Sequence, residues 1–380
     1  MISLCNSEEL IPSICFVAHN AFGALAGEDN GHIGGIERQQ SLMAHWMASQ
    51  GCDVSMITWD EGQGDCTIRG VKVLTLGRRQ DGVPGLRFFH PRWTGLIRAM
   101  QRADADIYYY NCGDMGLGQV ALWANRHGKK TVYSVASDPD CDPELPTLKP
   151  WRERILYRYG LLHADQTIAQ TQRQEEMLRT GFGICAEVIP MPCAGFSEAA
   201  PLELHGGPPR IVWIGRFSRE KRLEWLLDVA ENFPRFVFDV VGSANVSTEY
   251  AKSLLQRAES IPNVILHGRM VHHELGVLYH RARLLCCTSV FEGFPNTFLE
   301  AWSVGLPIVS SFDPDNVIAS KGLGKTACTV EELSVSVAAL IEDQNLWQQT
   351  SSAALEYYTS HHTLDAVMPK FVELFQRINR

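Results

Sequence analysis

The chain has 380 residues, of which 45% are hydrophobic and 20% are charged, and its formal net charge is −9. This length corresponds to about two to three domains, and the composition excludes a disordered protein. The negative charge argues against a general nucleic-acid-binding protein, which would normally be basic. No apolar run reaches the roughly 18 residues of a membrane-spanning helix. Glu8 and Glu9, which precede a short apolar run, argue against a signal peptide.

The cysteines point to a reducing compartment. The chain holds 11 of them, without paired metal-ligand spacing, and Cys15, Cys286 and Cys287 lie in apolar runs. Buried, reduced thiols are the ordinary state of such residues in the cytosol. We therefore expect a cytoplasmic protein.

Strands and helices are predicted to alternate along the first half of the chain. An apolar run at 13–20 is followed by a glycine-rich loop, by a helix at 36–51 with apolar residues on one face, and by a second strand at 52–59. This order opens a doubly wound α/β sheet. The pair Gly34-Gly35 either lets the backbone approach a phosphate closely or forms a flexible loop before a helix cap. Further strands are predicted at 71–76, 107–111, 131–138, 166–171 and 187–192, and helices at 96–106, 115–130 and 149–165.

A segment without apolar periodicity separates this half from a second one with the same alternation. Residues 195–209 contain three prolines and three glycines, a composition typical of a linker. The alternation restarts with a strand at 210–217, and an amphipathic helical run with a break near His361-His362 ends the chain. We expect a first domain at 1–195, a linker at 196–209, a second domain at 210–355 and a C-terminal helix at 356–380 that packs on the first domain.

The most informative stretch lies in the second half. A buried strand at 284–290 is followed by a loop with Glu292, by a short helix that carries Glu300, and by a strand at 308–311. Backbone N–H groups at a helix start favour a phosphate, and a nearby carboxylate can accept hydrogen bonds from sugar hydroxyls. The unit therefore predicts a ligand that contains both a sugar and a phosphate.

Two features of this half allow a structural interpretation as well. Thr297 and Glu300 fit a capping box, which would occupy the carboxylate with its own helix. Arg216 and Lys221, at the end of a strand and the start of a helix, can neutralise a diphosphate. The structural alternative is a surface salt bridge at the helix start, of Glu220 with Arg222 or with Lys221.

Two stretches of the first half carry candidate functional groups. The loop at 137–146 holds Asp138 and Asp140, which are typical of a solvated or active-site loop because the glycine and glutamate of a calcium loop are missing. The helix at 149–159 is basic and aromatic. It indicates either a solvated helix with partly inward-packed aromatic residues or a surface for anionic lipid.

The stretch from Arg210 to Ser311 resembles the retaining glycosyltransferases of family 4, which have the GT-B fold. The resemblance rests on GRFSREKR (215–222), on FDVVG (238–242), on NVILHGRM (263–270) and above all on EGFPNTFLEAWSVGLPIV (292–309). Glu292 and Glu300 match the family's Glu-x7-Glu motif. The glycine loop and helix at 34–58 agree more loosely, and VIPMPC (188–193) departs from the family's pattern.

The resemblance implies a role for each matching residue. Glu300 would bind the nucleotide ribose, Glu292 would contact the transferred sugar, and Arg216 and Lys221 would hold the diphosphate as electrostatic catalysts. Where many members have a histidine near the reacting carbon, this chain has Ala136-Ser137-Asp138, so Asp138 is a candidate substitute. The donor-binding residues implied are Gly35, Gly215, Arg216, Lys221, Glu292, Gly293, Phe294, Pro295, Asn296, Thr297 and Glu300.

The implied fold is two doubly wound Rossmann-like domains that face each other across a cleft. The implied activity is that of a hexosyltransferase-type enzyme, which moves a sugar from a UDP- or GDP-sugar to a hydroxyl of a sugar, glycan or lipid-linked acceptor, as in assembly of cell-surface polysaccharide, lipopolysaccharide or glycolipid. Neither metal nor cofactor is expected, and residues 149–159 could give peripheral contact with the inner face of a membrane. Two alternatives stay open: a GT-B relative that acts as a phosphorylase, synthase or epimerase, and a catalytically silent module that binds a nucleotide sugar.

Overall fold

The computed structural model describes residues 11–28, 34–83, 87–148, 150–196, 206–243 and 248–380. The chain divides into two compact units. The first unit contains residues 1–192 and 364–380, and the second contains residues 193–363. Within the described ranges, no helix is both long and apolar enough to cross a bilayer.

The first unit is built on a sheet with the strand order β3-β4-β2-β1-β5-β6-β7-β8. Every neighbouring pair is parallel except β3 and β4, which are antiparallel. The central strands are buried on both faces, as parallel strands between two helical layers must be. The strands are β1 (Ile14–Val17), β2 (Val54–Thr58), β3 (Cys66–Ile68), β4 (Val71–Thr75), β5 (Ile107–Tyr110), β6 (Lys130–Ser134), β7 (Gln166–Ala169) and β8 (Glu187–Val188).

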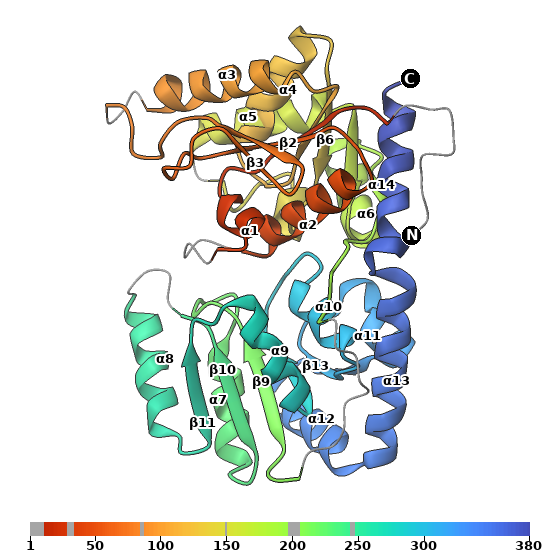
Figure 1. Cartoon of the computed structure of the whole chain (residues 1–380). Helices are drawn as coiled ribbons and strands as arrows, with labels where there is room; N and C mark the ends of the chain where they lie inside the picture. The colour runs from red at the N-terminus through yellow and green to blue at the C-terminus, as the bar shows by residue number, and fades with distance from the viewer. Residues whose placement is uncertain (1–10, 29–33, 84–86, 149, 197–205, 244–247) are drawn as a thin grey trace. The chain divides into compact units, whose positions relative to one another are not determined.

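Helices cover both faces of this sheet (Figure 1). On one face, α2 and the C-terminal helix α14 enclose a core that includes Phe16, Tyr109 and Phe371. On the other face, α3, α4, α5 and α6 enclose a core that includes Tyr108 and Tyr157. The helices are α1 (Phe22–Ala26), α2 (Gly35–Ser49), η2 (Phe88–Trp93), α3 (Thr94–Ala103), α4 (Gly116–Arg126), η3 (Asp138–Cys141), α5 (Trp151–His163), α6 (Gln172–Phe182) and α14 (Leu364–Ile378).

The second unit is a smaller, wholly parallel sheet with the order β11-β10-β9-β12-β13-β14. One face packs against α7, α8 and α12, and the other against α9, α10, α11 and α13. The elements are β9 (Arg210–Ile214), α7 (Leu223–Asn232), β10 (Val237–Val241), α8 (Glu249–Ser260), β11 (Val264–Gly268), α9 (His272–Arg281), β12 (Leu284–Cys287), α10 (Asn296–Ser303), β13 (Ile308–Ser310), η4 (Pro314–Asn316), α11 (Val317–Lys321), β14 (Gly324–Thr326), α12 (Val330–Glu342) and α13 (Gln344–His361).

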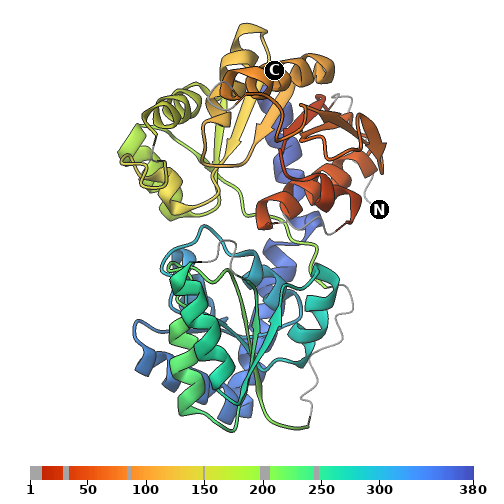
Figure 2. The ribbon, with the colours of Figure 1, turned by 90° about the vertical axis from the view of Figure 1, so that its left-hand side faces the viewer.

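The unit boundaries differ from the expected ones at 195, 210 and 355. The second unit begins at Cys193, because the ring of Phe196 stacks on His272 at 4.8 Å. Most of the expected linker, residues 197–205, lies outside the described residues. Helix α13 belongs to the second unit, where the Tyr358 hydroxyl donates to the Cys193 carbonyl at 2.9 Å. Only α14 packs in the first unit, and Figure 2 shows it, in blue, among the elements of that unit.

Candidate active site

The carboxyl ends of β9 and β12 mark the point where the strand order of the second unit reverses, the usual ligand-binding edge of a doubly wound sheet. The two strands pair in parallel, with Val212 beside Leu285. The loop that follows β9 and the loop that follows β12 therefore leave the sheet side by side. Gly242, at φ 144°, lies so close to the Gly215 carbonyl that a Cβ atom there would approach the oxygen to 1.8 Å. Gly215 is thereby fixed by backbone packing.

Lys221 and Glu292, 71 positions apart in the sequence, form an ion pair at this edge. Their side chains are 20% and 18% exposed, so both reach solvent from a largely enclosed position. Ser289 Oγ donates to Glu292 Oε1 at 2.6 Å, and Thr288 Oγ1 donates to the Lys221 carbonyl at 2.6 Å. These contacts hold a cation and a carboxylate side by side where two loops meet.

Arg216 is more exposed than Lys221 and pairs with Glu220 at 3.3 Å. Arg222, which the sequence offered only as a salt-bridge partner of Glu220, organises the same edge. Its guanidinium donates to the Thr288 carbonyl at 2.8 Å and to Ser311 Oγ at 2.8 Å, and so ties the loop after β9 to the loops after β12 and β13. Its planar, multiply donating head group suits this bridging position.

Glu300 does not cap its helix, so the capping-box interpretation is wrong. Helix α10 has Pro295 as N-cap, with no side-chain capping bond, which places Glu300 at the fifth helical position, two past the position that a capping box requires. Its carboxylate instead contacts His272 Nε2 at 3.1 Å and accepts from the Tyr279 hydroxyl at 2.8 Å. Both partners lie on α9, in the sequence HHELGVLYH (272–280). This sequence holds no motif that predicts a contact with Glu300. Each carboxylate oxygen keeps lone pairs for a further donor.

The loop from Gly293 to Thr297 leads into the first turn of α10. Phe294 folds back on this unit, with its ring 6.0 Å from Trp302 and 5.1 Å from His362. Gly293 and Pro295 are buried, whereas Asn296 and Thr297 are partly exposed. The loop is thus anchored by its apolar residues, and the first turn of an uncapped helix stays accessible beside Lys221 and Glu292.

Two predicted site residues lie in the first unit. Gly35 begins α2, and the Glu37 carboxylate accepts from the Gly34 N–H at 3.0 Å, so an acidic side chain already occupies that helix start. Asp138 is buried and contacts Arg173 at 3.3 Å and Gln174 Nε2 at 3.2 Å.

Asp138 and Asp140 both lie in the 3-10 helix η3. Asp140 accepts from the Ser137 N–H at 2.9 Å and from Ser137 Oγ at 3.2 Å, and burial raises its pKa to about 6. Within the described ranges, no group of three His, Cys, Asp or Glu side chains could hold a metal ion.

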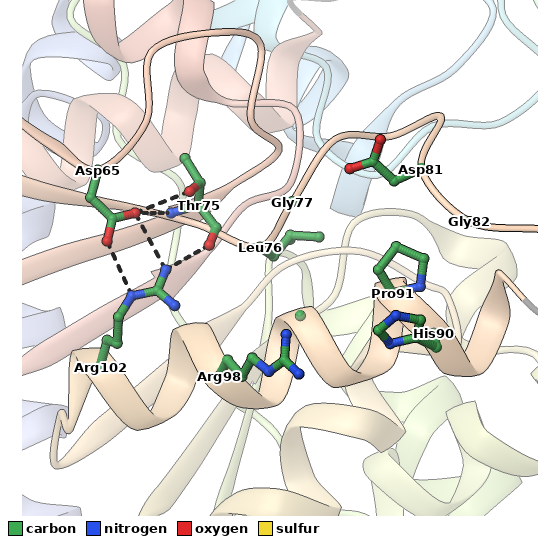
Figure 3. A pocket seen from close by; sticks show the side chains of 11 residues that line it. Asp65, Thr75, Leu76, Gly77, Asp81, Gly82, His90, Pro91, Arg98 and Arg102 are labelled. Atoms are coloured by element: carbon green, nitrogen blue, oxygen red, sulfur yellow. Dashed lines mark hydrogen bonds and ion pairs between the residues drawn. The ribbon is translucent and has the colours of Figure 1, made fainter.

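A large open cavity of about 780 Å³ lies in the first unit, away from every predicted site residue. It opens beside Thr75, Leu76 and Gly77 at the carboxyl end of β4. Figure 3 shows Arg98 and Arg102 extending from α3 along it, where Asp65 bonds to both Thr75 and Arg102. Its other lining residues are Asp81, Gly82, His90, Pro91 and Gly95. A cavity of this size can hold a small organic ligand.

Two family models match the chain, one in each unit. Residues 34–193 match the model described as "Glycosyl transferase 4-like domain", and residues 208–343 match "Glycosyl transferases group 1". Together they span most of the chain, in the order in which the two units occur. The chain is a glycosyltransferase of the GT-B type. The predicted architecture of two doubly wound domains is thereby confirmed.

Curated relatives of this glycosyltransferase are distant. The GtfA subunit of a UDP-N-acetylglucosamine–peptide N-acetylglucosaminyltransferase from Streptococcus pneumoniae is 24% identical over 164 residues. That match covers 40% of the chain and only 32% of the GtfA subunit, so it spans about a third of that relative's length. An uncharacterized 41.2 kDa protein in the cps region of Klebsiella pneumoniae is 19% identical over 74% of the chain and 81% of its own length.

Solved structures share the fold of the glycosyltransferase over nearly its whole length. The Anabaena protein HepE in complex with UDP and glucose has a TM-score of 0.75 at 17% identity, and covers 96% of this chain and 99% of its own. The sucrose-phosphate synthase from Thermosynechococcus elongatus has a TM-score of 0.78 at 17% identity, with 97% and 99% coverage. At such identity the likeness concerns the fold.

Proposed function

We propose that this glycosyltransferase moves a sugar from a nucleoside diphosphate donor to an acceptor hydroxyl with retention of the anomeric configuration, as a member of family 4. The observation that carries the proposal is the Lys221–Glu292 pair beside the open first turn of α10. A cation, a carboxylate proposed to bind the sugar, and the N–H groups of a helix start then lie within one small area. A nucleotide sugar presents the complementary diphosphate and hydroxyls.

In the proposed reaction, the bond between the acceptor oxygen and C1 of the donor sugar forms as the bond from C1 to the β-phosphate oxygen breaks. Negative charge develops on the leaving diphosphate, and Lys221, Arg216 and the α10 N-terminus stabilise it. Lys221 exchanges Glu292 for the diphosphate, and the Glu292 carboxylate then accepts a hydrogen bond from the transferred sugar. The acceptor proton can pass to the leaving diphosphate. Glu300, held by His272 and Tyr279, accepts from the ribose hydroxyls.

The names of similar proteins support a proposal for the donor and for the acceptor. HepE is described in complex with UDP-glucose, and GtfA is named for a UDP-N-acetylglucosamine donor. A solved galactosyltransferase, WaaB, is named for the lipopolysaccharide outer core. We accordingly propose a UDP-hexose donor, used without a metal ion, and an acceptor in cell-surface polysaccharide or glycolipid assembly.

A peripheral membrane contact belongs to the same proposal. On α5, Trp151 is 75% exposed, Ile155 56% and Leu162 57%, and Arg152 lies 5.1 Å from the Phe88 ring centroid. Tyr157, in contrast, is buried, so the aromatic residues of this helix divide between core and surface. We expect binding to vesicles that contain anionic lipid at low salt. Absence of such binding would remove the membrane contact from the proposal.

The central test is mass spectrometry and NMR of the products formed from a panel of UDP- and GDP-sugars with sugar and lipid-linked acceptors. We expect one donor to give a glycosylated acceptor with its anomeric configuration retained, and equal rates with and without EDTA. An altered sugar nucleotide in the absence of acceptor would indicate an epimerase instead. Donor binding without turnover on any acceptor would indicate a silent binding module.

A further inference from the structure

An aromatic ring from the beginning of the second unit covers the two side chains that hold Glu300. The ring belongs to Phe196, close to Cys193, where this unit begins. It stacks on His272 with the ring centroids 4.8 Å apart and the planes at 24°, and its centroid is 5.2 Å from that of Tyr279. His272 Nε2 contacts one oxygen of the Glu300 carboxylate, and the Tyr279 hydroxyl donates to the other. Phe196 therefore packs against both side chains that fix this carboxylate.

The helices α9 and α10 both accommodate Phe196. On α9, a Cβ atom at Gly276 would approach the Phe196 ring to 3.0 Å, so the close packing needs the glycine. Glycine is a poor residue for a helix interior, and the ring explains its place here. On α10, Ser303 Oγ accepts from the Phe196 N–H at 3.2 Å and donates to the Glu300 carbonyl at 2.6 Å. Phe196 is thus held by the helix of Glu300 and by the helix of its two partners.

The backbone that leads to this ring, residues 193–196, is bonded within the same unit. The Cys193 N–H donates to the His362 carbonyl at 2.8 Å, and the Cys193 carbonyl accepts from the Tyr358 hydroxyl at 2.9 Å. Gly195, at φ 66°, has no room for a side chain, because a Cβ atom there would lie 2.6 Å from the Tyr358 hydroxyl oxygen. The stretch by which the chain enters the second unit is therefore bonded to the stretch by which it leaves.

The Glu300 carboxylate is held in one orientation in a largely enclosed position. Its side chain is 8% exposed, and each of its oxygens has a partner. Burial and, to a smaller extent, the negative charge of Glu300 raise the pKa of the Cys193 thiol to about 12, as expected if residues 193–196 lie beside the carboxylate. A carboxylate held in this way offers its remaining lone pairs in a fixed direction, and such preorganisation reduces the entropy lost on binding a ligand.

We propose that Phe196 is a positioning residue for the nucleotide. Its ring holds His272 and Tyr279 against Glu300, and so couples nucleotide binding to the order of residues 193–196. The inference rests on the proposed function, in which Glu300 accepts hydrogen bonds from the ribose hydroxyls. Phe196 itself does not touch the nucleotide. Because such a coupling is reciprocal, a bound nucleotide stabilises the ordered state of residues 193–196 as much as that state stabilises binding.

The test compares Phe196→Ala with Phe196→Tyr, which keeps the stacking ring, and with the control Phe233→Ala. Phe233 is partly exposed like Phe196 and stacks on Phe236 at 5.0 Å, but it precedes β10 at the opposite edge of the same sheet. Phe196→Ala should weaken UDP binding, measured by calorimetry, and raise the donor KM about 5–20-fold, within the range of coupling between sites. Its kcat should change less than about threefold. Phe196→Tyr and Phe233→Ala should keep wild-type affinity.

A double-mutant cycle separates positioning from general destabilisation. In the Glu300→Gln background, Phe196→Ala should weaken UDP binding by less than about a further twofold, because the carboxylate that the ring positions is gone. With saturating UDP, amide hydrogen exchange of residues 193–196 should slow in the wild type but not in Phe196→Ala.

A second variant guards against misfolding. Phe196→Leu keeps an apolar side chain without the stacking ring, should also weaken UDP binding, and decides the question if Phe196→Ala does not fold. UDP affinity within about twofold of the wild type, or equal losses in the two backgrounds, would overturn the inference and leave the proposed function intact. A wild-type protein that binds no UDP would overturn both.

Discussion

The two sheet edges of this glycosyltransferase hold their charged side chains differently. In the second unit, each predicted cation is neutralised by a carboxylate: Lys221 pairs with Glu292, and Arg216 pairs with Glu220. In the first unit, Asp138 and Asp140 are buried and accept hydrogen bonds from Gln174 and Ser137, and Asp138 also pairs with Arg173. In the second unit, the anionic diphosphate of a donor can replace the carboxylate that pairs with a cation.

Removal of Lys221 should have the largest effect at the sheet edge of the second unit. Lys221→Ala deletes the cation that faces the leaving diphosphate, and a lost group of this kind costs about 3–4 kcal/mol of transition-state stabilisation. We expect kcat to fall about 10²–10³-fold while the melting temperature stays within a few degrees. Lys325→Ala, at an exposed position on β14 of the same unit, should leave kcat unchanged. Near-normal turnover of Lys221→Ala would remove Lys221 from the proposed machinery.

Much of the fold could be predicted from the sequence because parallel strands are continuous apolar runs. ICFV, IYYY and LLCC are almost fully buried, and each was recognised from composition alone. The expected break near His361-His362 is confirmed, since α13 ends at His361 and α14 begins at Leu364. The place where the chain returns to the first unit depends on Tyr357 and Tyr358 packing against residues far away in sequence. Periodicity carries no such information.

The site was predictable to the extent that its residues lie close together in sequence. Glu292 and Glu300 share one loop and helix, so their spacing was informative. The Lys221–Glu292 pair and the support of Glu300 by α9 arise from strand order, which brings together segments that are distant in the chain.

Asp140, a buried acid at the sheet edge of the first unit, gives a second test. Burial raises the Asp140 pKa to about 6 from 3.8, so the folded protein binds more protons than the unfolded chain between these values. Stability should therefore fall as the pH rises from about 4 to 6, by roughly 3 kcal/mol at most. Asp140→Asn should lack this decline. Urea unfolding of both proteins from pH 3.5 to 7.5, with Asp142→Asn as control, measures the difference, and parallel curves would refute the role of burial.

Substitution of Glu300 tests whether the sheet edge of the second unit binds the nucleotide. Glu300→Gln keeps the size of the side chain and removes its charge, and a hydrogen bond to a charged group contributes about 1.5–3 kcal/mol. We expect UDP affinity, measured by calorimetry, to fall about 10–100-fold with a smaller change in kcat. Tyr279→Phe removes a hydrogen bond to the same carboxylate and should weaken UDP binding less. Equal affinity in wild type and Glu300→Gln would assign Glu300 to packing alone.

The smallest expected effect comes from removal of a helix N-cap in each unit, which distinguishes the stabilities of the two units. Thr171 caps α6 in the first unit, where its Oγ1 accepts from the Gln174 N–H at 3.1 Å, and Thr329 caps α12 in the second, where it accepts from the Glu332 N–H at 3.2 Å. Replacement of either by alanine should cost about 1 kcal/mol. Because UDP should stabilise the second unit through binding to its folded form, calorimetry with UDP identifies that unit's transition. Thr329→Ala should lower the midpoint temperature of the transition that UDP shifts, and Thr171→Ala should lower that of the other transition. A single transition that both variants shift equally would show that the two units unfold together.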